Sequence, residues 1–140
     1  MNSEKTDMIL VSKSKFNQEE TIQRLNSLLS ENGWKVITTH NFQEILSKNG
    51  VVINPMQVLE VCKPALASEI LTNNALLMYS PLMPCRISVY INGDMDCYIS
   101  RLNSAAMASQ IGGIIYQVMG KANIEIEGII SQLIQKASIL

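Results

Sequence analysis

The chain has 140 residues, enough for one domain that buries its own core without disulfides or metal. Its formal net charge of -1 excludes a strongly basic surface, so we expect no binding to nucleic acid. Three cysteines, an odd number, argue against a disulfide framework, and no apolar run approaches the roughly 20 residues that span a bilayer. No signal peptide is visible, which predicts a single cytoplasmic domain over residues 1–140, or a periplasmic one if a leader was removed before Met1.

Periodicity and capping residues predict the first elements. A short apolar run over 8–11 indicates a strand. Asn17 is a typical helix N-cap, apolar residues follow it at helical spacing, and Gly33 stands where a helix ends. Residues 34–40 alternate and are rich in β-branched side chains, so we expect a second strand that ends at His40.

The middle of the chain alternates short helices with a strand. Asn41 is a second N-cap and predicts a short helix over 42–46. Residues 56–62 predict a strand and 65–71 a helix, whereas 75–79 fit either a helix or an extended segment. The Ser80-Pro81 and Met83-Pro84 pairs are expected to prevent regular structure, and Pro84 should hold residue 83 extended.

A β-hairpin is predicted around Asn92-Gly93. Polar and apolar residues alternate over 86–91, and residues 97–100 run back after the turn. An Asn-Gly pair between such runs is typical of a two-residue turn, because both of its central residues need a positive φ.

Two C-terminal helices complete the predicted order, over 104–118 and 125–136, with Asn103 as the first N-cap and Gly120 ending or kinking the first helix. Gly112-Gly113 would cost of order 2 kcal/mol inside that helix relative to Ala, which predicts close approach of another backbone. The order is β-α-β-α-β-α-β-β-α-α. We therefore expect an α+β fold: a mainly antiparallel sheet with helices packed on one face.

The order and spacing of several segments resemble one known family. They are FNQEETIQRLNSLLSENG at 16–33, the strand ending in His40, PMQVL at 55–59, Lys63-Pro64, and a proline-led strand with an Asn-Gly hairpin. Together they resemble the domain-of-unknown-function family 302 over about residues 8–105. The resemblance implies a β-α-β(4)-α fold, here with extra C-terminal helices at 104–137. It also implies a homodimer, and it implies no established activity.

His40 is the first candidate site residue, because it is the only histidine and sits at a strand end before a helix N-cap. Imidazole is a common axial ligand, so a metal or cofactor role with haem as the specific candidate is one interpretation, with Met78, Met83 or Met107 as a weak second ligand. The alternative is an ordinary hydrogen-bonded or exposed histidine.

Cys62 and Cys85 are the second candidates, each beside a proline at the end or the start of a predicted strand. If those strands are antiparallel neighbours, the two thiols lie close together. Arg86 next to Cys85 would then lower the thiol pKa and favour the thiolate. The alternative is two small buried apolar side chains, which is the usual place of free cysteine.

Three functional interpretations remain open. The first is a homodimeric binding module for a small apolar ligand or haem, with its site near His40, Cys62, Met83, Cys85 and Arg86. The second is a thiol-based redox or sulfur-handling protein that uses Cys62 and Cys85. The third is a structural domain that binds a protein partner. The sequence favours binding over catalysis, and no catalytic residue is predicted.

Overall fold

Five strands form one sheet in the order β1-β5-β4-β3-β2 in the computed structural model, which describes residues 8–135. Each strand is antiparallel to its neighbours. The strands are β1 (Ile9–Lys13), β2 (Lys35–Asn41), β3 (Met56–Cys62), β4 (Cys85–Ile91) and β5 (Cys97–Leu102). The predicted α+β class and the antiparallel sheet are confirmed.

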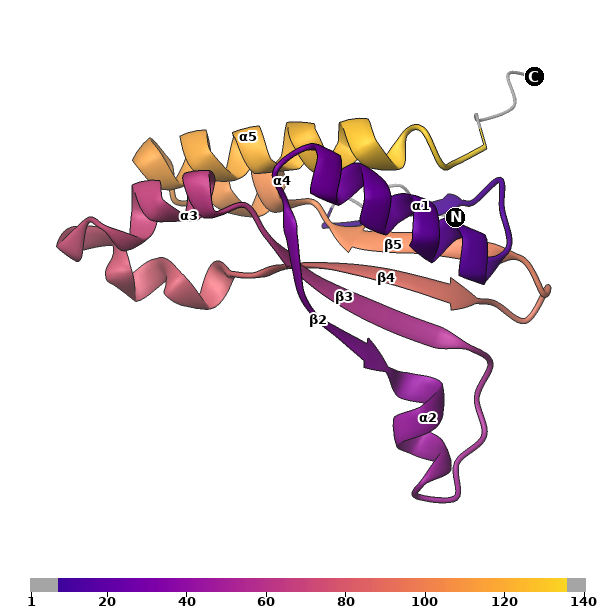
Figure 1. Ribbon diagram of the computed structural model, residues 1–140. Helices are drawn as coiled ribbons and strands as arrows, with labels where there is room; N and C mark the ends of the chain where they lie inside the picture. Colours follow the sequence, from indigo (N-terminus) through magenta and orange to yellow (C-terminus); the bar gives the residue numbers. More distant parts are fainter. Residues whose placement is uncertain (1–7, 136–140) are drawn as a thin grey trace.

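The helices lie between the strands and after them. Figure 1 shows α1 and α5 lying across the same face of the sheet. The elements are α1 (Gln18–Glu31), α2 (Phe42–Ser47), α3 (Pro64–Leu71), the 3₁₀ helix η2 (Asn74–Leu82), α4 (Ser104–Ala108) and α5 (Gly113–Ile130). Asn17 and Asn41 act as the predicted N-caps, because their side-chain oxygens accept from backbone N–H groups of Glu20 and Glu44. None of the described helices is both long and apolar enough to cross a bilayer.

Strand side chains alternate between two faces of the sheet that differ in burial. The core face lies under α1 and α5, and its buried apolar members on the three central strands are Leu59, Val61, Ile87, Val89, Cys97 and Ile99. The opposite face, which we call the open sheet face, carries Val11, Val58, Ser88, Ser100 and Leu102. The hydrophobic core therefore sits on one side of the sheet.

Arg101 is a charged residue on the core face and is buried. Its Nε and Nη2 donate to the two carboxylate oxygens of Glu127 on α5, at 2.8 and 2.6 Å. Its Nη1 donates to Ser12 Oγ at 3.0 Å and to the Ile99 carbonyl at 3.1 Å. This bidentate pair links β5 to α5 and compensates the burial of the guanidinium.

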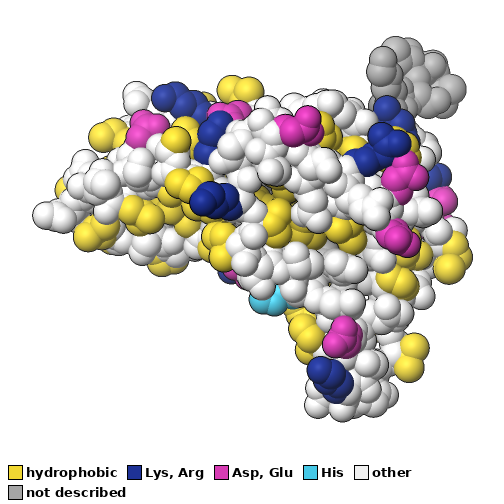
Figure 2. Space-filling model, viewed as in Figure 1, with side chains coloured by type: hydrophobic (Ala, Val, Ile, Leu, Met, Phe, Trp, Pro, Cys, Tyr) yellow, Lys and Arg dark blue, Asp and Glu magenta, His cyan; other side chains and the backbone are white. Residues whose placement is uncertain are grey.

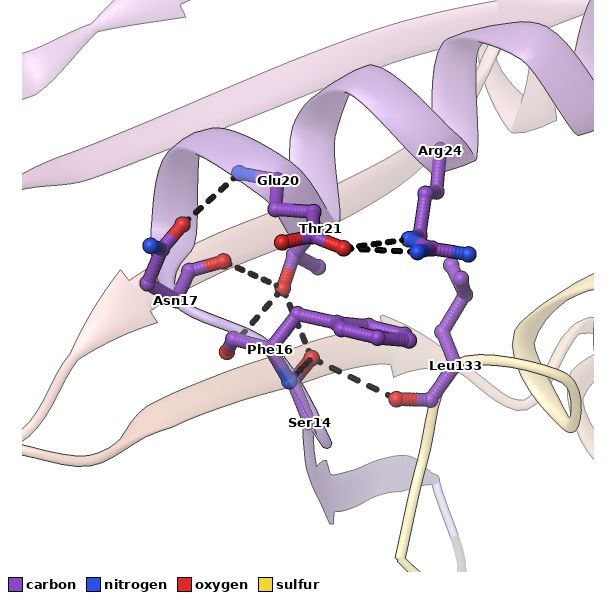
Figure 3. A network of polar contacts seen from close by, with 7 residues as sticks. All are labelled: Ser14, Phe16, Asn17, Glu20, Thr21, Arg24 and Leu133. Atoms are coloured by element: carbon purple, nitrogen blue, oxygen red, sulfur yellow. Dashed lines mark hydrogen bonds and ion pairs between the residues drawn. The ribbon is translucent and has the colours of Figure 1, made fainter.

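A second polar network joins the start of α1 to the segment after α5 (Figure 3). The hydroxyls of Ser14 and Thr21 lie 2.6 Å apart, and the Ser14 hydroxyl also reaches the Leu133 carbonyl at 3.3 Å. Thr21 Oγ1 donates to the Asn17 carbonyl at 2.7 Å. Both hydroxyls are buried and both have partners, so the network holds α1 against the C-terminal part of the core.

The predicted hairpin is present, but its two-residue turn is wrong. Ile91 pairs with Cys97, which leaves residues 92–96 as the connection, and Met95 rather than Asn92 or Gly93 has a positive φ, of 69°. The Met95 N–H donates to the Asn92 carbonyl, and Asp94 Oδ1 accepts from the Asp96 N–H. These local hydrogen bonds stabilise a longer turn followed by one left-handed residue.

The predicted helix break at Gly120 and the helix through Gly112-Gly113 are also wrong. Gly112 and Gly113 have φ of 75° and 58° and separate α4 from α5. A Cβ at either residue would meet nothing within 4 Å, so backbone conformation rather than close approach explains the pair. Helix α5 then runs through Gly120 to Ile130, which joins the two helices that the sequence predicted separately. The second predicted helix also ends too late, because α5 stops at Ile130 and residues 131–135 are not helical; residue 136 lies outside the described residues.

The segment before β4 is more regular than the sequence predicts. Residues expected to lack regular structure at Ser80-Pro81 belong to η2. Proline fits there because its fixed φ is close to that of a 3₁₀ turn. Met83 is extended as predicted, with φ of -120° and ψ of 152°.

Candidate functional site

The predicted site residues divide between two places in the fold. His40 and Arg86 lie near Glu60 across three neighbouring strands, β2, β3 and β4. Met83 and Cys85 instead pack against the hydrophobic core, where β4 begins under α5. The structure therefore does not bring His40 and Cys85 together.

His40 is paired with an acid that the sequence analysis did not select. Its Nε2 lies 2.6 Å from Glu60 Oε2, and its side chain is 39% exposed. Figure 2 shows the chain's one histidine at the surface. Arg86 Nε stands 3.9 Å from the same Glu60 oxygen. Among the described residues, no group of three or more His, Cys, Asp or Glu side chains is placed to hold a metal ion, and His40 borders none of the cavities described below.

Two adjoining cavities lie where the end of η2 and the start of β4 meet α5. The larger has a volume of about 90 Å³ and the smaller about 30 Å³. Four residues border both cavities: Pro84, Cys85, Met119 and Ala122. Because these four form a shared wall, we treat the two spaces as one site and call it the paired cavities.

The walls of the paired cavities are mainly apolar. Trp34, Leu66 and Ile70 line the smaller cavity, and Leu82, Met107 and Ile126 line the larger one. Polar side chains are few: Ser104, Asn123, Arg86 and Arg101 border the larger cavity, and Lys63 borders the smaller. In Figure 2 hydrophobic side chains also gather on the surface at the end of the molecule formed by α3 and η2.

One acid on α5 anchors two residues that line the smaller cavity. Glu125 Oε1 accepts from Trp34 Nε1 at 3.1 Å and pairs with Lys63 Nζ at 2.6 Å. Trp34 is buried and precedes β2, whereas Lys63 follows β3. These two interactions hold the start of β2 and the end of β3 against α5, and the Glu125 carboxylate balances the Lys63 charge.

Cys85 is half-buried in the shared wall and is not an activated thiol. Burial raises the pKa of the Cys85 thiol; the nearby Cys62 raises it further, and the Ser104 hydroxyl opposes the rise. The expectation that Arg86 lowers this pKa is wrong, because Arg86 is directed toward Glu60 and desolvation dominates. At neutral pH Cys85 is therefore protonated.

Cys62 and Cys85 come from neighbouring antiparallel strands and both border the smaller cavity. Val61 is the register partner of Cys85, and both pack against the core. Cys62 follows Val61 at the end of β3, and both Cys62 and Cys85 are free cysteines. Cys97 is buried.

The sequence analysis missed the half of the site that α5 contributes. Met119, Ala122 and Ile126 border the larger cavity from that helix. Their spacing of three and four residues is the helical signal that would have placed them on one face. The predicted break at Gly120 hid this pattern.

A wider hollow of about 700 Å³ lies beside α1. It is lined mostly by polar and charged side chains, among them Glu19, Arg24 and Glu31. An apolar ligand would find little matching surface there, so we do not include this hollow in the candidate site.

Comparison with known proteins places the fold. The family model described as "Domain of unknown function DUF302" matches residues 10–135, which carries the resemblance beyond the expected limit near residue 105. A solved structure described as "Crystal structure of uncharacterized conserved protein DUF302 from Bacillus stearothermophilus" is similar with a TM-score of 0.78 and 22% identity. The alignment covers 90% of this chain and 98% of that one, and at this identity it shows the shared fold alone. No curated protein matches the chain.

Proposed function

We propose that this chain, which belongs to the DUF302 family, is a homodimeric module that binds a small apolar ligand in the paired cavities. The observation that carries the proposal is that Pro84, Cys85, Met119 and Ala122 border both of two mainly apolar cavities, which therefore lie side by side. Apolar walls with a few polar groups are typical of small-molecule sites.

The character of the walls supports an apolar and compact ligand. Met83, Met107 and Met119 border the cavities, and unbranched thioethers adapt to ligands of varied shape. Ser104 and Asn123 at the larger cavity are uncharged hydrogen-bonding groups that can orient one polar atom of a ligand. We therefore expect a ligand of a few heavy atoms with at most one polar end.

The haem version of the proposal has less support than a small ligand. The larger cavity measures about 90 Å³, whereas sites for drug-sized ligands occupy roughly 300–1,000 Å³. His40 Nε2 is already paired with Glu60, and His40 does not border the paired cavities. Haem binding by His40 thus stays a prediction from the sequence.

The thiol-redox alternative also has less support. A reactive cysteine needs an accessible thiolate, but Cys85 is half-buried and its pKa is raised. Cys62 and Cys85 both border the smaller cavity, but they are free thiols rather than a disulfide. We therefore assign Cys85 to the wall of the ligand site.

Trp34 allows a direct test, because it is the only tryptophan and lines the smaller cavity. We expect bromobenzene, an apolar heavy-atom quencher, to lower the Trp34 fluorescence with a saturable dependence on concentration. Ala122→Leu adds side-chain volume to the shared wall and should weaken binding by about tenfold or more.

Ile124→Leu on the same helix is the matched control, since Ile124 is 73% exposed and lies outside both cavities. It should leave the bromobenzene affinity unchanged. Linear quenching without saturation, or equal affinity in the Ala122→Leu protein, would refute the ligand site. Near-ultraviolet circular dichroism checks that each variant is folded.

The homodimer part of the proposal assigns the open sheet face to a second copy of the chain. Ile9, Val11 and Leu102 are exposed apolar side chains at one end of this face. Ser88 and Ser100 are small residues nearer its middle, where they allow another sheet to approach. Exposed apolar side chains that gather on part of a sheet face are typical of an interaction surface.

Light scattering after gel filtration tests the dimer. Val11→Lys places a charge on the open sheet face and should give the monomer mass. Met78→Lys, on η2 and 74% exposed, is the control and should keep the dimer mass. A monomeric parent protein, or a dimer that survives Val11→Lys unchanged, contradicts this assignment.

A further inference from the structure

We propose that the segment from α2 to β3, residues 42–54, packs on a second copy of the chain, against the β1 side of that copy's open sheet face. We call this segment the α2 arm. The inference rests on the homodimer of the proposed function and specifies how the two copies fit together. It concerns a part of the chain that borders neither of the paired cavities.

The α2 arm is ordered by its own hydrogen bonds, yet it buries no side chain. The Val51 N–H donates to the Leu46 carbonyl at 3.0 Å, and Gln43 Nε2 donates to the Ile53 carbonyl at 3.3 Å. Every residue from 42 to 54 is exposed or only partly buried. A short helix gains most of its stability from packing rather than from propensity, so the arm has apolar surface left to bury against another molecule.

The exposed side chains of the α2 arm include several large apolar ones. Ile45, Val51 and Val52 are all exposed, and Val52, at 92%, is the most exposed large hydrophobic side chain among the described residues. A valine that exposed contributes almost nothing to the stability of a single copy. Several such side chains on one short segment indicate an interaction surface.

The α2 arm lies on the side of the sheet that carries the open sheet face. His40, just before the arm, is the register partner of Val58 on that face. The ring of Phe42, the first residue of α2, lies beside the His40 ring, with 6.0 Å between their centroids. Figure 1 shows α2 at the end of β2, on the side of the sheet away from α1 and α5. The arm therefore projects beyond the open sheet face at its β2 side.

The receiving surface lies at the opposite edge of the same sheet. β1 and β2 are its two outer strands, about 19 Å apart because neighbouring strands lie about 4.8 Å from each other. Ile9, Val11 and Leu102 are the exposed apolar side chains at the β1 side. Packed sheets lie about 10 Å apart and a helix is about 10 Å wide, so a helix at one edge can span the gap to a facing sheet.

The occupant that fits these surfaces is a second copy of the chain. A two-fold axis parallel to the strands places β2 of each copy opposite β1 of the other, so the same arm contact forms twice. The formal net charge of -1 means that two copies repel each other only weakly. A single peptide or helix from another protein would cover only one of the two apolar surfaces.

A charge-pair experiment tests the contact, with sedimentation equilibrium of the full-length protein at low salt as the measurement. Val11→Lys and Val52→Glu each leave one charge without a partner in the contact, and each should raise the dimer dissociation constant by about tenfold or more. The double variant V11K/V52E brings opposite charges together across the contact and should return to within about threefold of the parent. Within one copy these positions lie at opposite edges of the sheet, so such coupling has to cross the dimer.

V11K/I124E is the matched control, because Ile124 is exposed on α5, on the other side of the sheet. It should stay as weak a dimer as Val11→Lys alone. Ile45→Glu, also on the arm, should weaken the dimer as Val52→Glu does, and it decides the question if Val52→Glu fails to fold.

Two results would overturn the arm contact alone. They are a Val52→Glu protein that keeps the parent dissociation constant while Val11→Lys is monomeric, and a V11K/V52E protein that recovers no better than the control. Either one leaves the homodimer of the proposed function standing. A monomeric parent protein would refute both the homodimer and the arm contact.

Discussion

Arg101 keeps a full charge inside the core because Glu127 offers both carboxylate oxygens to it. Glu127→Gln removes that compensating charge and should lower the free energy of unfolding by about 2 kcal/mol. Glu44→Gln is the control, because Glu44 forms only an exposed pair with Lys48 and should cost less than about 0.5 kcal/mol. Urea denaturation measures both, and equal stability of the two variants would show that the buried pair is not stabilising.

Tyr98 is the hairpin residue whose pKa departs furthest from its usual value. Its hydroxyl donates to the Asp94 carboxylate, and this hydrogen bond is the main cause that raises the pKa of Tyr98 to about 12 from the usual value of 10. The stabilisation is present below pH 10 and is lost as the pH rises through about 12, since the phenolate would face a carboxylate. Ultraviolet absorbance of the phenolate, with Tyr98→Phe as the reference, should show the pKa falling toward its usual value in Asp94→Asn. An unchanged pKa in that variant would disprove the contact.

At the scale of elements, the glycines around α5 differ in what they do. Gly112 has φ of 75° and ψ of -167°, a conformation open essentially to glycine alone, so Gly112→Ala should destabilise the protein by about 1–3 kcal/mol. Gly120 lies inside α5 with open space where a Cβ would stand, so Gly120→Ala should stabilise it by about 0.5–1 kcal/mol. Thermal or urea unfolding of the two variants should give opposite signs. A shared sign would contradict the placement of the helix start.

The elements that the sequence predicted well are those with local causes. Asn17, Asn41 and Asn103 cap helices where expected, because capping depends on neighbouring backbone N–H groups alone. The two-residue turn predicted at Asn92-Gly93 and the helix predicted through Gly112-Gly113 are wrong. In both places residue preference allows several conformations, and the choice depends on hydrogen bonds or backbone geometry that composition does not reveal.

At the scale of the whole molecule, four of the predicted residues, Cys62, Met83, Cys85 and Arg86, border the paired cavities, whereas His40 lies apart from them. His40 and Cys85 both lie at strand ends, yet His40 pairs with Glu60 while Cys85 faces the core, because strand register and alternation decide the face. The contribution of Met119 and Ala122 depends on α5 being continuous through Gly120, which is a consequence of packing against the sheet and α3. Tertiary contacts, rather than residue preference, assemble the paired cavities.

The central claim is that the paired cavities admit a small ligand, and a crystal soaked with bromobenzene tests it most directly. Bromine scatters anomalously, so its position can be located without assumptions about the protein. We predict a bromine peak between β4 and α5, beside Cys85, Met119 and Ala122. No peak there at saturating bromobenzene, or a peak confined to the hollow beside α1, would contradict the account.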